Sequence, residues 1–211
     1  MNLADIQAVA AQQMQRQKAR LERETGHIYY HGQRVGRSVI LLRERVAPED
    51  ASHDDILTVA AWFHDIGKAF RHHQRFGAAL AREALGDLLS PAQLEDVCAL
   101  ISRHDDRRPG SDDSLWLKLL QDADLIDHFG TQWIWLHLFW YAHADESIAE
   151  ALASENLAAQ QNESRAQLHF PESRRIYDEK CAYERAFIER METESRGEFF
   201  EPRETQPAAN I

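Results

Sequence analysis

Cysteine is scarce in this sequence of 211 residues, which contains only Cys98 and Cys181. A disulfide-stapled scaffold and a thiolate zinc site both need more cysteines than this. The two cysteines lie in amphipathic surroundings. We therefore expect two free thiols that are buried or partly buried.

Long apolar runs are also absent. No segment approaches the roughly 20 apolar residues that a membrane span needs, and residues 1–20 contain no apolar core of a signal peptide. We therefore expect a cytoplasmic protein with no membrane partner. The length suits one domain, and contents of 44% apolar and 28% charged residues are ordinary for a globular protein.

Basic residues are outnumbered, with 24 Lys and Arg against 35 Asp and Glu, which gives a net charge of −11. This balance argues against a dedicated nucleic-acid-binding protein, because such proteins usually carry a basic face. It leaves nucleotides open as ligands, because a metal ion and a few local cations can hold a phosphate. The 11 histidines, in contrast, exceed what packing requires and indicate a functional site.

Convincing strand patterns are lacking, and apolar residues recur at helical spacing along most of the chain. The pattern predicts an all-α protein. The helix that ends at His64 is apolar on nearly all sides, so we expect it at the centre of the bundle. The aromatic stretch 133–141 fits core packing, an oligomer contact or stacking on a base. We expect helices over residues 4–24, 31–46, 56–64, 78–85, 91–104, 114–126, 146–159 and 172–196, with loops at 69–77 and 160–171.

The central segment is an apolar run that ends in His64 and Asp65. A buried imidazole and carboxylate need a charge partner or a metal ion, because an unpaired buried charge is costly. Both side chains are good ligands for divalent cations. His31 and Asp124 lie on two other expected helices, and inward-facing side chains from separate helices can bind one ion. These four residues therefore predict a mixed nitrogen and oxygen metal site.

Each of these residues also has an ordinary structural explanation. His31 alone fits a surface or capping histidine, and Asp124 alone fits a helix-surface acid. His-Asp pairs recur by chance, as residues 53–54 and 104–105 show, although those pairs lie in polar surroundings. Order, spacing and context together favour the metal site.

The same residues carry a resemblance to a known family. The segments HGQRV at 31–35, AWFHDIGK at 61–68 and QDADLIDHFG at 121–130 resemble, in this order, the motifs of the HD-domain metal-dependent phosphohydrolase superfamily. The match covers about residues 25–130. Within the superfamily, the chain is most similar to small stand-alone bacterial HD proteins that act on phosphate esters or nucleotide pyrophosphates.

The resemblance implies an HD-domain helical bundle in which His31, His64, Asp65 and Asp124 bind one divalent ion, which could be Mn, Fe, Zn, Co or Mg. It also implies a hydrolase that cleaves a phosphate ester or pyrophosphate of a small molecule, with nucleotides favoured. Water activated by the metal would be the nucleophile, and Asp65 would orient or deprotonate this water.

Other side chains near the motifs are candidates for catalysis and for binding the substrate. Lys68 follows His64 by one helical turn and could place an ammonium near a phosphate. Arg34 could bind a phosphate bidentately or pair with a carboxylate. His104 is a candidate general acid or phosphate ligand. The expected substrate-binding residues are Lys68, Arg34, His72 and His73.

The helical face of Asp124 also carries Asp127 and His128. These two residues could orient the ligands through hydrogen bonds or could form a polar rim. Asp122 points to a different face, which favours a structural or supporting role over ligation.

The expected organisation is one domain in four parts. Residues 1–24 form an N-terminal helix that packs on the bundle, and residues 25–142 form the HD-domain core. Residues 143–197 form a C-terminal helical extension of the same domain. Residues 198–211 form a loosely ordered polar tail.

Two other functions stay open as alternatives. An HD-type di-iron oxygenase would use a similar scaffold with more inward histidines. His72, His73 and His104 are available, but they lack the spacing of two-metal members, so one ion is favoured. The other alternative is a non-catalytic HD module that senses a nucleotide or a metal. The expected partner is a small phosphate-bearing molecule, and a homodimer is left open.

Overall fold

A computed structural model describes residues 1–21, 23–147, 149–150, 152 and 156–201. Within these residues the chain is helical and contains no β-strand, which confirms the all-α fold class. The expected tail lies outside the described residues from position 202 onward. The helices are α1 (Leu3–Met14), α2 (His27–Val46), α3 (Asp54–Phe63), α4 (His73–Leu85), α5 (Pro91–Arg103), α6 (Leu115–Asp127), α7 (Thr131–Ala144), α9 (Leu157–Ala166) and α10 (Pro171–Ser195).

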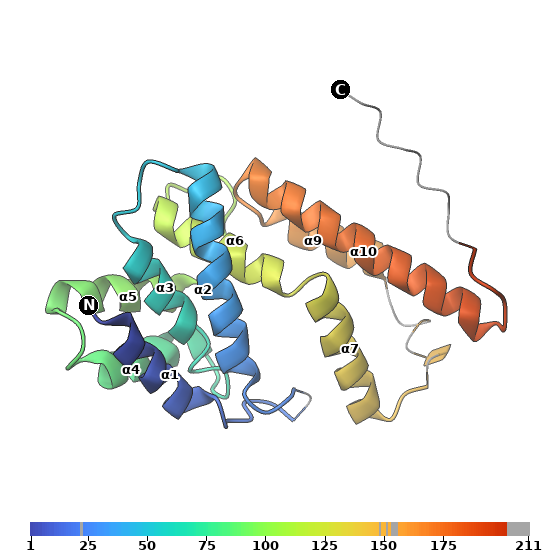
Figure 1. Cartoon of the computed structure of the whole chain (residues 1–211), viewed down its shortest axis with the longest axis horizontal. Coiled ribbons are helices and arrows are strands. Elements are labelled where there is room, and N and C mark those ends of the chain that lie inside the picture. Colours follow the sequence, from blue (N-terminus) through green and yellow to red (C-terminus); the bar gives the residue numbers. More distant parts are fainter. Residues whose placement is uncertain (22, 148, 151, 153–155, 202–211) are drawn as a thin grey trace.

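The helices of the N-terminal half surround α3. Helix α2 lies against α3 on one side, and α5 contacts α3 and pairs with α4 (Figure 1). Helix α6 packs on α2, while α10 lies beside α9 and reaches α6, α7 and α2. None of the described helices combines the length and apolar character needed to cross a bilayer.

Helix α3 is the most enclosed of these elements, as its sequence predicts. All but three of its ten residues are buried, because apolar side chains occur on every face. His64 follows directly as the C-terminal capping residue of α3, so the apolar helix carries the histidine into the interior.

Gly32 allows α2 and α3 to approach closely. A Cβ atom at this position would lie 2.8 Å from the carbonyl oxygen of Trp62. Only hydrogen fits in that space, so the backbones of the two helices meet at this point. His31 directly precedes Gly32 and His64 follows Trp62 by two residues, so the close approach brings their side chains together.

Gly67 allows a second close approach, between the turn after α3 and the first turns of α4. A Cβ atom at Gly67 would lie 2.6 Å from the backbone nitrogen of Gly77. The turn therefore packs directly on the α4 backbone. This contact fixes His73, at the start of α4, relative to Asp65.

The substitution Gly67→Ala is expected to destabilise the protein through overpacking. Such insertions typically cost about 1–3 kcal/mol, and each kcal/mol lowers the Tm by roughly 2–4 °C in a chain of this size. Thermal unfolding followed by circular dichroism measures the effect. Gly86→Ala is the matched control, because its added Cβ atom would lie further from its nearest neighbour, at 3.2 Å from the carbonyl oxygen of Arg82. Equal Tm values for the two variants would contradict the packing argument.

Several expected boundaries differ from the structure. The helix expected over 4–24 ends at Met14, because few apolar residues follow at helical spacing. Helix α2 begins at His27 instead of His31, directly after Gly26 in the left-handed region with φ 79°. The expected loop 69–77 is helical from His73 onward, and the expected loop 160–171 is helical to Ala166. Of the helix expected over 146–159, residues 149–150, 152 and 157–159 are helical, while 148, 151 and 153–155 lie outside the described residues.

The buried apolar residues form two clusters, one among α1 to α6 and a smaller one where α6, α7 and α10 meet. Cys98 and Cys181 are buried free thiols, as expected. The aromatic stretch 133–141 is divided: Trp133 is buried, whereas Trp135 and Trp140 are 51% and 41% exposed. The stretch therefore contributes to the core with one face only.

Candidate metal centre

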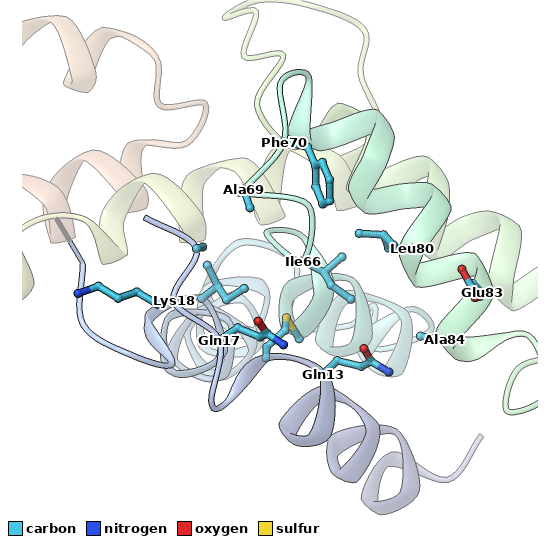
Figure 2. Close-up of a pocket in the computed structure, with 12 residues that line it drawn as sticks. Gln13, Gln17, Lys18, Ile66, Ala69, Phe70, Leu80, Glu83 and Ala84 are labelled. Carbon is cyan, nitrogen blue, oxygen red and sulfur yellow. The ribbon is translucent and has the colours of Figure 1, made fainter. Parts of the chain in front are cut away.

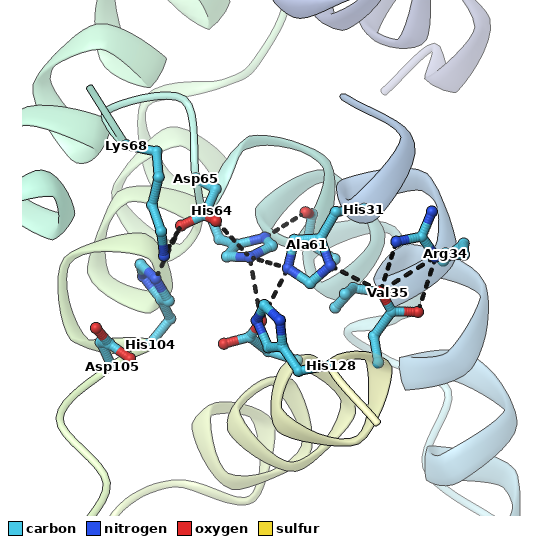
Figure 3. A network of polar contacts seen from close by, with 12 residues as sticks. His31, Arg34, Val35, Ala61, His64, Asp65, Lys68, His104, Asp105 and His128 are labelled. Atoms are coloured by element: carbon cyan, nitrogen blue, oxygen red, sulfur yellow. Dashed lines mark hydrogen bonds and ion pairs between the residues drawn. The ribbon is translucent and has the colours of Figure 1, made fainter. Parts of the chain in front are cut away.

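Three helices bring the four expected ligands to one buried point. His31 lies on α2, and His64 and Asp65 follow α3 (Figure 3). Asp124 lies on α6. Each of the four is at most 3% exposed. The Nε2 atoms of His31 and His64 are 3.1 Å apart, and Asp124 Oδ1 lies 3.0 Å and 3.4 Å from them. The structure thus places together residues up to 93 positions apart in the sequence.

Hydrogen bonds direct the Nε2 atoms of three buried histidines toward this point. His64 and His104 each donate from Nδ1 to the carbonyl oxygen three residues earlier, at 2.7 Å. His31 donates from Nδ1 to Asp127 Oδ2 at 2.8 Å. Such bonds fix the tautomer that leaves a lone pair on Nε2, which is the arrangement metal-binding histidines usually have.

The donor set fits a divalent ion. Ligand atoms about 2.0–2.2 Å from one ion lie roughly 3 Å from one another, which is close to the spacing of the His31, His64 and Asp124 donors. Asp65 Oδ2 is further out, at 3.8 Å from His64 Nε2. His31, His64 and Asp65 form one group whose donor atoms lie within 4.8 Å of one another, and His64, His104 and Asp124 form another. Mixed imidazole and carboxylate donors suit Mn, Fe, Zn or Co.

Asp65, His73 and His104 form a further group with the same spacing. The Nε2 atoms of His73 and His104 lie 3.7 Å and 3.6 Å from Asp65 Oδ1. Both nitrogen atoms are buried without a hydrogen-bond partner within the described part of the chain. Buried polar atoms without partners are rare, so this group could hold an ion or a substrate atom.

The remaining expected site residues are divided between the centre and its edge. Lys68 Nζ donates to Asp65 Oδ1 at 3.1 Å, so the ammonium lies at the centre. The Arg34 guanidinium binds Asp127 with three hydrogen bonds of 2.9–3.1 Å. His72 is exposed and precedes α4 in the left-handed region. Nothing in the described structure connects His72 to the centre.

Sequence reasoning missed or undervalued three residues of this centre. His128 Nε2 lies 3.5 Å from Asp124 Oδ1, one helical turn after it. The pair at 104–105, set aside as a chance doublet, belongs to the centre, because Asp105 Oδ2 lies 3.6 Å from His73 Nε2. Arg107 donates to Asp105 and Asp124. The helical spacing from Asp124 indicated His128, whereas the loop residues carried no periodic signal.

Charges at the centre shift the protonation of its members. Burial alone would raise the pKa of Asp65, but His64 and His104 hold it well below its usual range. Burial alone would lower the pKa of His31, but hydrogen bonds to Asp124 and Asp127 raise it to about 9. The carboxylates of Asp65 and Asp124 are therefore ionised at neutral pH, as ligation requires, whereas His31 has to release a proton when it binds an ion.

A cavity of about 560 Å³ lies on the other side of the turn that follows Asp65. Figure 2 shows Phe70 and Ile66 on one wall and Gln13 and Gln17 on the opposite one. None of the candidate ligands lines it. The cavity is therefore separate from the metal centre.

The protein is an all-α bundle in which imidazoles and carboxylates from three helices converge, and these groups could hold a metal ion. Residues 28–128 match the family model of the HD domain, so this part of the chain is an HD domain. This match contains all four expected ligands, together with His73, His104, Arg107 and His128.

Two solved structures share the fold. Bacillus subtilis YpgQ, solved in complex with ADP, is 15% identical with a TM-score of 0.63, covering 93% of this chain and 99% of YpgQ. A Lactobacillus plantarum protein solved by structural genomics is 19% identical with a TM-score of 0.65, covering 93% of this chain and 97% of that protein. A search of curated proteins by sequence gives no significant match.

Proposed function

We propose that the protein is a metal-dependent phosphohydrolase that cleaves a phosphate ester or pyrophosphate of a small molecule, with a nucleotide as the favoured substrate. The observation that carries the proposal is the convergence of two Nε2 atoms and Asp124 Oδ1 within 3.4 Å of one another at a buried point. The HD-domain match over residues 28–128 supports the reaction class, because members of the HD-domain superfamily are generally metal-dependent phosphohydrolases.

In this proposal His31, His64, Asp65 and Asp124 hold one divalent ion. The bound ion would supply Lewis acidity toward a phosphoryl oxygen and would lower the pKa of water. Asp65 is the residue that orients the attacking water and accepts its proton, because its carboxylate lies at the centre and is ionised.

His104 is the proposed proton donor to the leaving group, since its Nε2 faces Asp65 at 3.6 Å and has no other partner among the described residues. It would act in its protonated form, because burial alone would lower the pKa of His104 but the Asp65 carboxylate raises it. Lys68 and His73 are the proposed contacts to the substrate, because both reach Asp65 from the more exposed side. Arg34 and His72 are weaker candidates for binding the substrate than Lys68 and His73. The Arg34 guanidinium is held by Asp127, and His72 is exposed.

The nucleotide preference has separate support. YpgQ, which shares the fold across nearly its whole length, was solved with ADP. Similarity at 15% identity establishes the fold alone, so a nucleotide substrate for this chain is part of the proposal. The aromatic side chains exposed on α7 offer surfaces on which a base could stack.

A metal-by-substrate screen tests the proposal. Purified apo-protein would be mixed with Mn, Fe, Zn, Co or Mg and with a panel of nucleotides and phosphomonoesters, and phosphate or pyrophosphate release would be measured. We expect release that depends on the added metal and disappears on chelation. The His64→Ala protein is the control for contaminating phosphatases. Inactivity of the metal-loaded protein across the panel would favour a sensing module.

A di-iron oxygenase is the second candidate, and the observation that favours it is the group formed by Asp65, His73 and His104. This group shares Asp65 with the first and provides two additional inward histidines. Metal analysis of the protein as isolated separates the two functions. Two iron atoms per chain would favour the oxygenase, and one divalent ion would favour the phosphohydrolase.

A further inference from the structure

Arg107 is the buried cation of the loop between α5 and α6. Its side chain is 10% exposed, whereas Arg103 and Arg108 in the same region are 45% and 67% exposed. Arg107 donates from Nη1 to Asp105 Oδ1 at 2.6 Å and from Nη2 to Asp124 Oδ2 at 2.5 Å. Its Nε is buried and has no partner within the described residues. Burying a guanidinium is costly, which calls for an explanation.

Asp124 divides its two oxygen atoms between different partners. Oδ1 faces the imidazoles of His31 and His64, and Oδ2 accepts from Arg107. The guanidinium therefore lies beside the point where the donor atoms converge and does not block it. Arg107 is thus one carboxylate away from the imidazole nitrogens of His31 and His64.

The charge balance of the centre indicates an anionic ligand. Four carboxylates, from Asp65, Asp105, Asp124 and Asp127, face the three cationic side chains of Lys68, Arg34 and Arg107. A divalent ion added to this set makes the centre positive. Without Arg107, the four carboxylates would already balance the charges of Lys68, Arg34 and the divalent ion. The positive charge that Arg107 adds therefore favours a negatively charged ligand such as a phosphoryl group.

The loop that carries Arg107 is held in place by hydrogen bonds from α6. Gln121 on α6 donates from Nε2 to the carbonyl oxygens of Arg103 and Asp106, at 3.0 Å and 3.1 Å. Gln121 is fully buried. The guanidinium is thus fixed by its own two carboxylates and by its backbone, and a fixed cation stabilises developing charge without reorganising.

From these observations we infer that Arg107 binds the phosphoryl group of the substrate, with Asp105 and Asp124 holding its guanidinium in position. The inference rests on the proposed function, since it assigns a contact to the substrate of the same centre. A guanidinium suits this role because its planar N–H groups match the oxygen atoms of a phosphate. The unpartnered Nε and the second N–H group of each Nη atom, which the carboxylates of Asp105 and Asp124 do not use, are the donors that remain for a phosphate.

The test uses Arg107→Gln and Arg107→Lys, with Arg108→Gln as the matched control. Arg108 is one residue further along the same loop and pairs with Asp106 at the surface. Isothermal titration would measure Mn²⁺ binding to each protein, and then binding of inorganic phosphate to the Mn²⁺-loaded protein. The same proteins would be assayed for hydrolysis of a substrate found in the screen.

We expect Arg107→Gln to weaken phosphate binding by at least about tenfold, since charge-assisted hydrogen bonds are lost. Its Mn²⁺ stoichiometry should stay that of the wild type, with affinity within about threefold. Arg107→Lys should recover part of the phosphate affinity, because it keeps the charge without the planar geometry. It also tests the inference if the glutamine variant fails to fold. Arg108→Gln should match the wild type.

Phosphate affinity unchanged in both Arg107 variants would overturn the inference, as would loss of Mn²⁺ from both, which would assign Arg107 to supporting Asp124 alone. Absence of phosphate binding by the wild type would overturn it too. If the wild type binds phosphate through Arg107 but hydrolyses no phosphoester, the inference stands and the proposed hydrolase function fails. The two failures are therefore distinguishable.

Discussion

His64→Ala and Asp65→Ala proteins are expected to lose the bound metal and the hydrolytic activity together. His64 contributes Nε2 from an imidazole whose tautomer is fixed by the Ala61 carbonyl. Asp65 belongs to two donor groups, one with His31 and His64 and one with His73 and His104. A metal supplies several kcal/mol of transition-state stabilisation, so its loss should lower the rate by roughly 10³-fold or more. Metal content by elemental analysis and turnover of a screened substrate would be measured on the same preparation.

His53→Ala is the matched control for this experiment. His53 belongs to the other His-Asp pair, and its ring stacks on Trp116 at 4.4 Å, outside the metal centre. This variant should keep its metal and its activity. Hydrolysis retained by a metal-stripped Asp65→Ala protein would show that the reaction does not use this centre.

The sequence was sufficient for the parts of this protein that depend on helical periodicity. The apolar run before His64 predicted a buried central helix, and α3 is buried on nearly all sides. The helical pattern also predicted the all-α fold, and the motifs around His31, His64 and Asp124 predicted an HD domain. Both are confirmed, the second by the HD-domain match over residues 28–128. The structure brings these residues together, while their roles as metal ligands stay a prediction.

The parts that could not be predicted are in loops and at helix ends. The histidine-rich segment 69–77 was expected to be a loop because basic residues obscured its helical pattern, and α4 in fact begins at His73. Arg107 and Asp105 follow the end of α5, where side-chain direction depends on loop geometry that Gln121 fixes from another helix. No periodicity encodes a contact of this kind. The division of the chain at residue 142 stays a prediction.

Asp127→Ala is expected to weaken metal binding by about 10–100-fold, the usual effect of removing a partner that orients a ligand. Asp127 accepts from His31 Nδ1 at 2.8 Å, and its carboxylate is itself held by Arg34. Without it, His31 loses the bond that fixes its tautomer and ring orientation. Asp127→Asn should lie between alanine and wild type, since its amide oxygen can still accept from Nδ1. Mn²⁺ titration would measure the three affinities.

Asp122→Ala distinguishes this positioning role from a general effect on folding. Asp122 lies on the same helix but accepts from the backbone nitrogens of His169 and Phe170, at 3.0 Å and 3.1 Å, at the start of α10. Its loss should lower the Tm and leave the Mn²⁺ affinity of the folded protein unchanged, because no bond connects it to a candidate ligand. If Asp127→Ala instead lowers the Tm as Asp122→Ala does and binds Mn²⁺ like the wild type, then Asp127 holds Arg34 and α2 in the fold, and His31 needs no partner to face the ion.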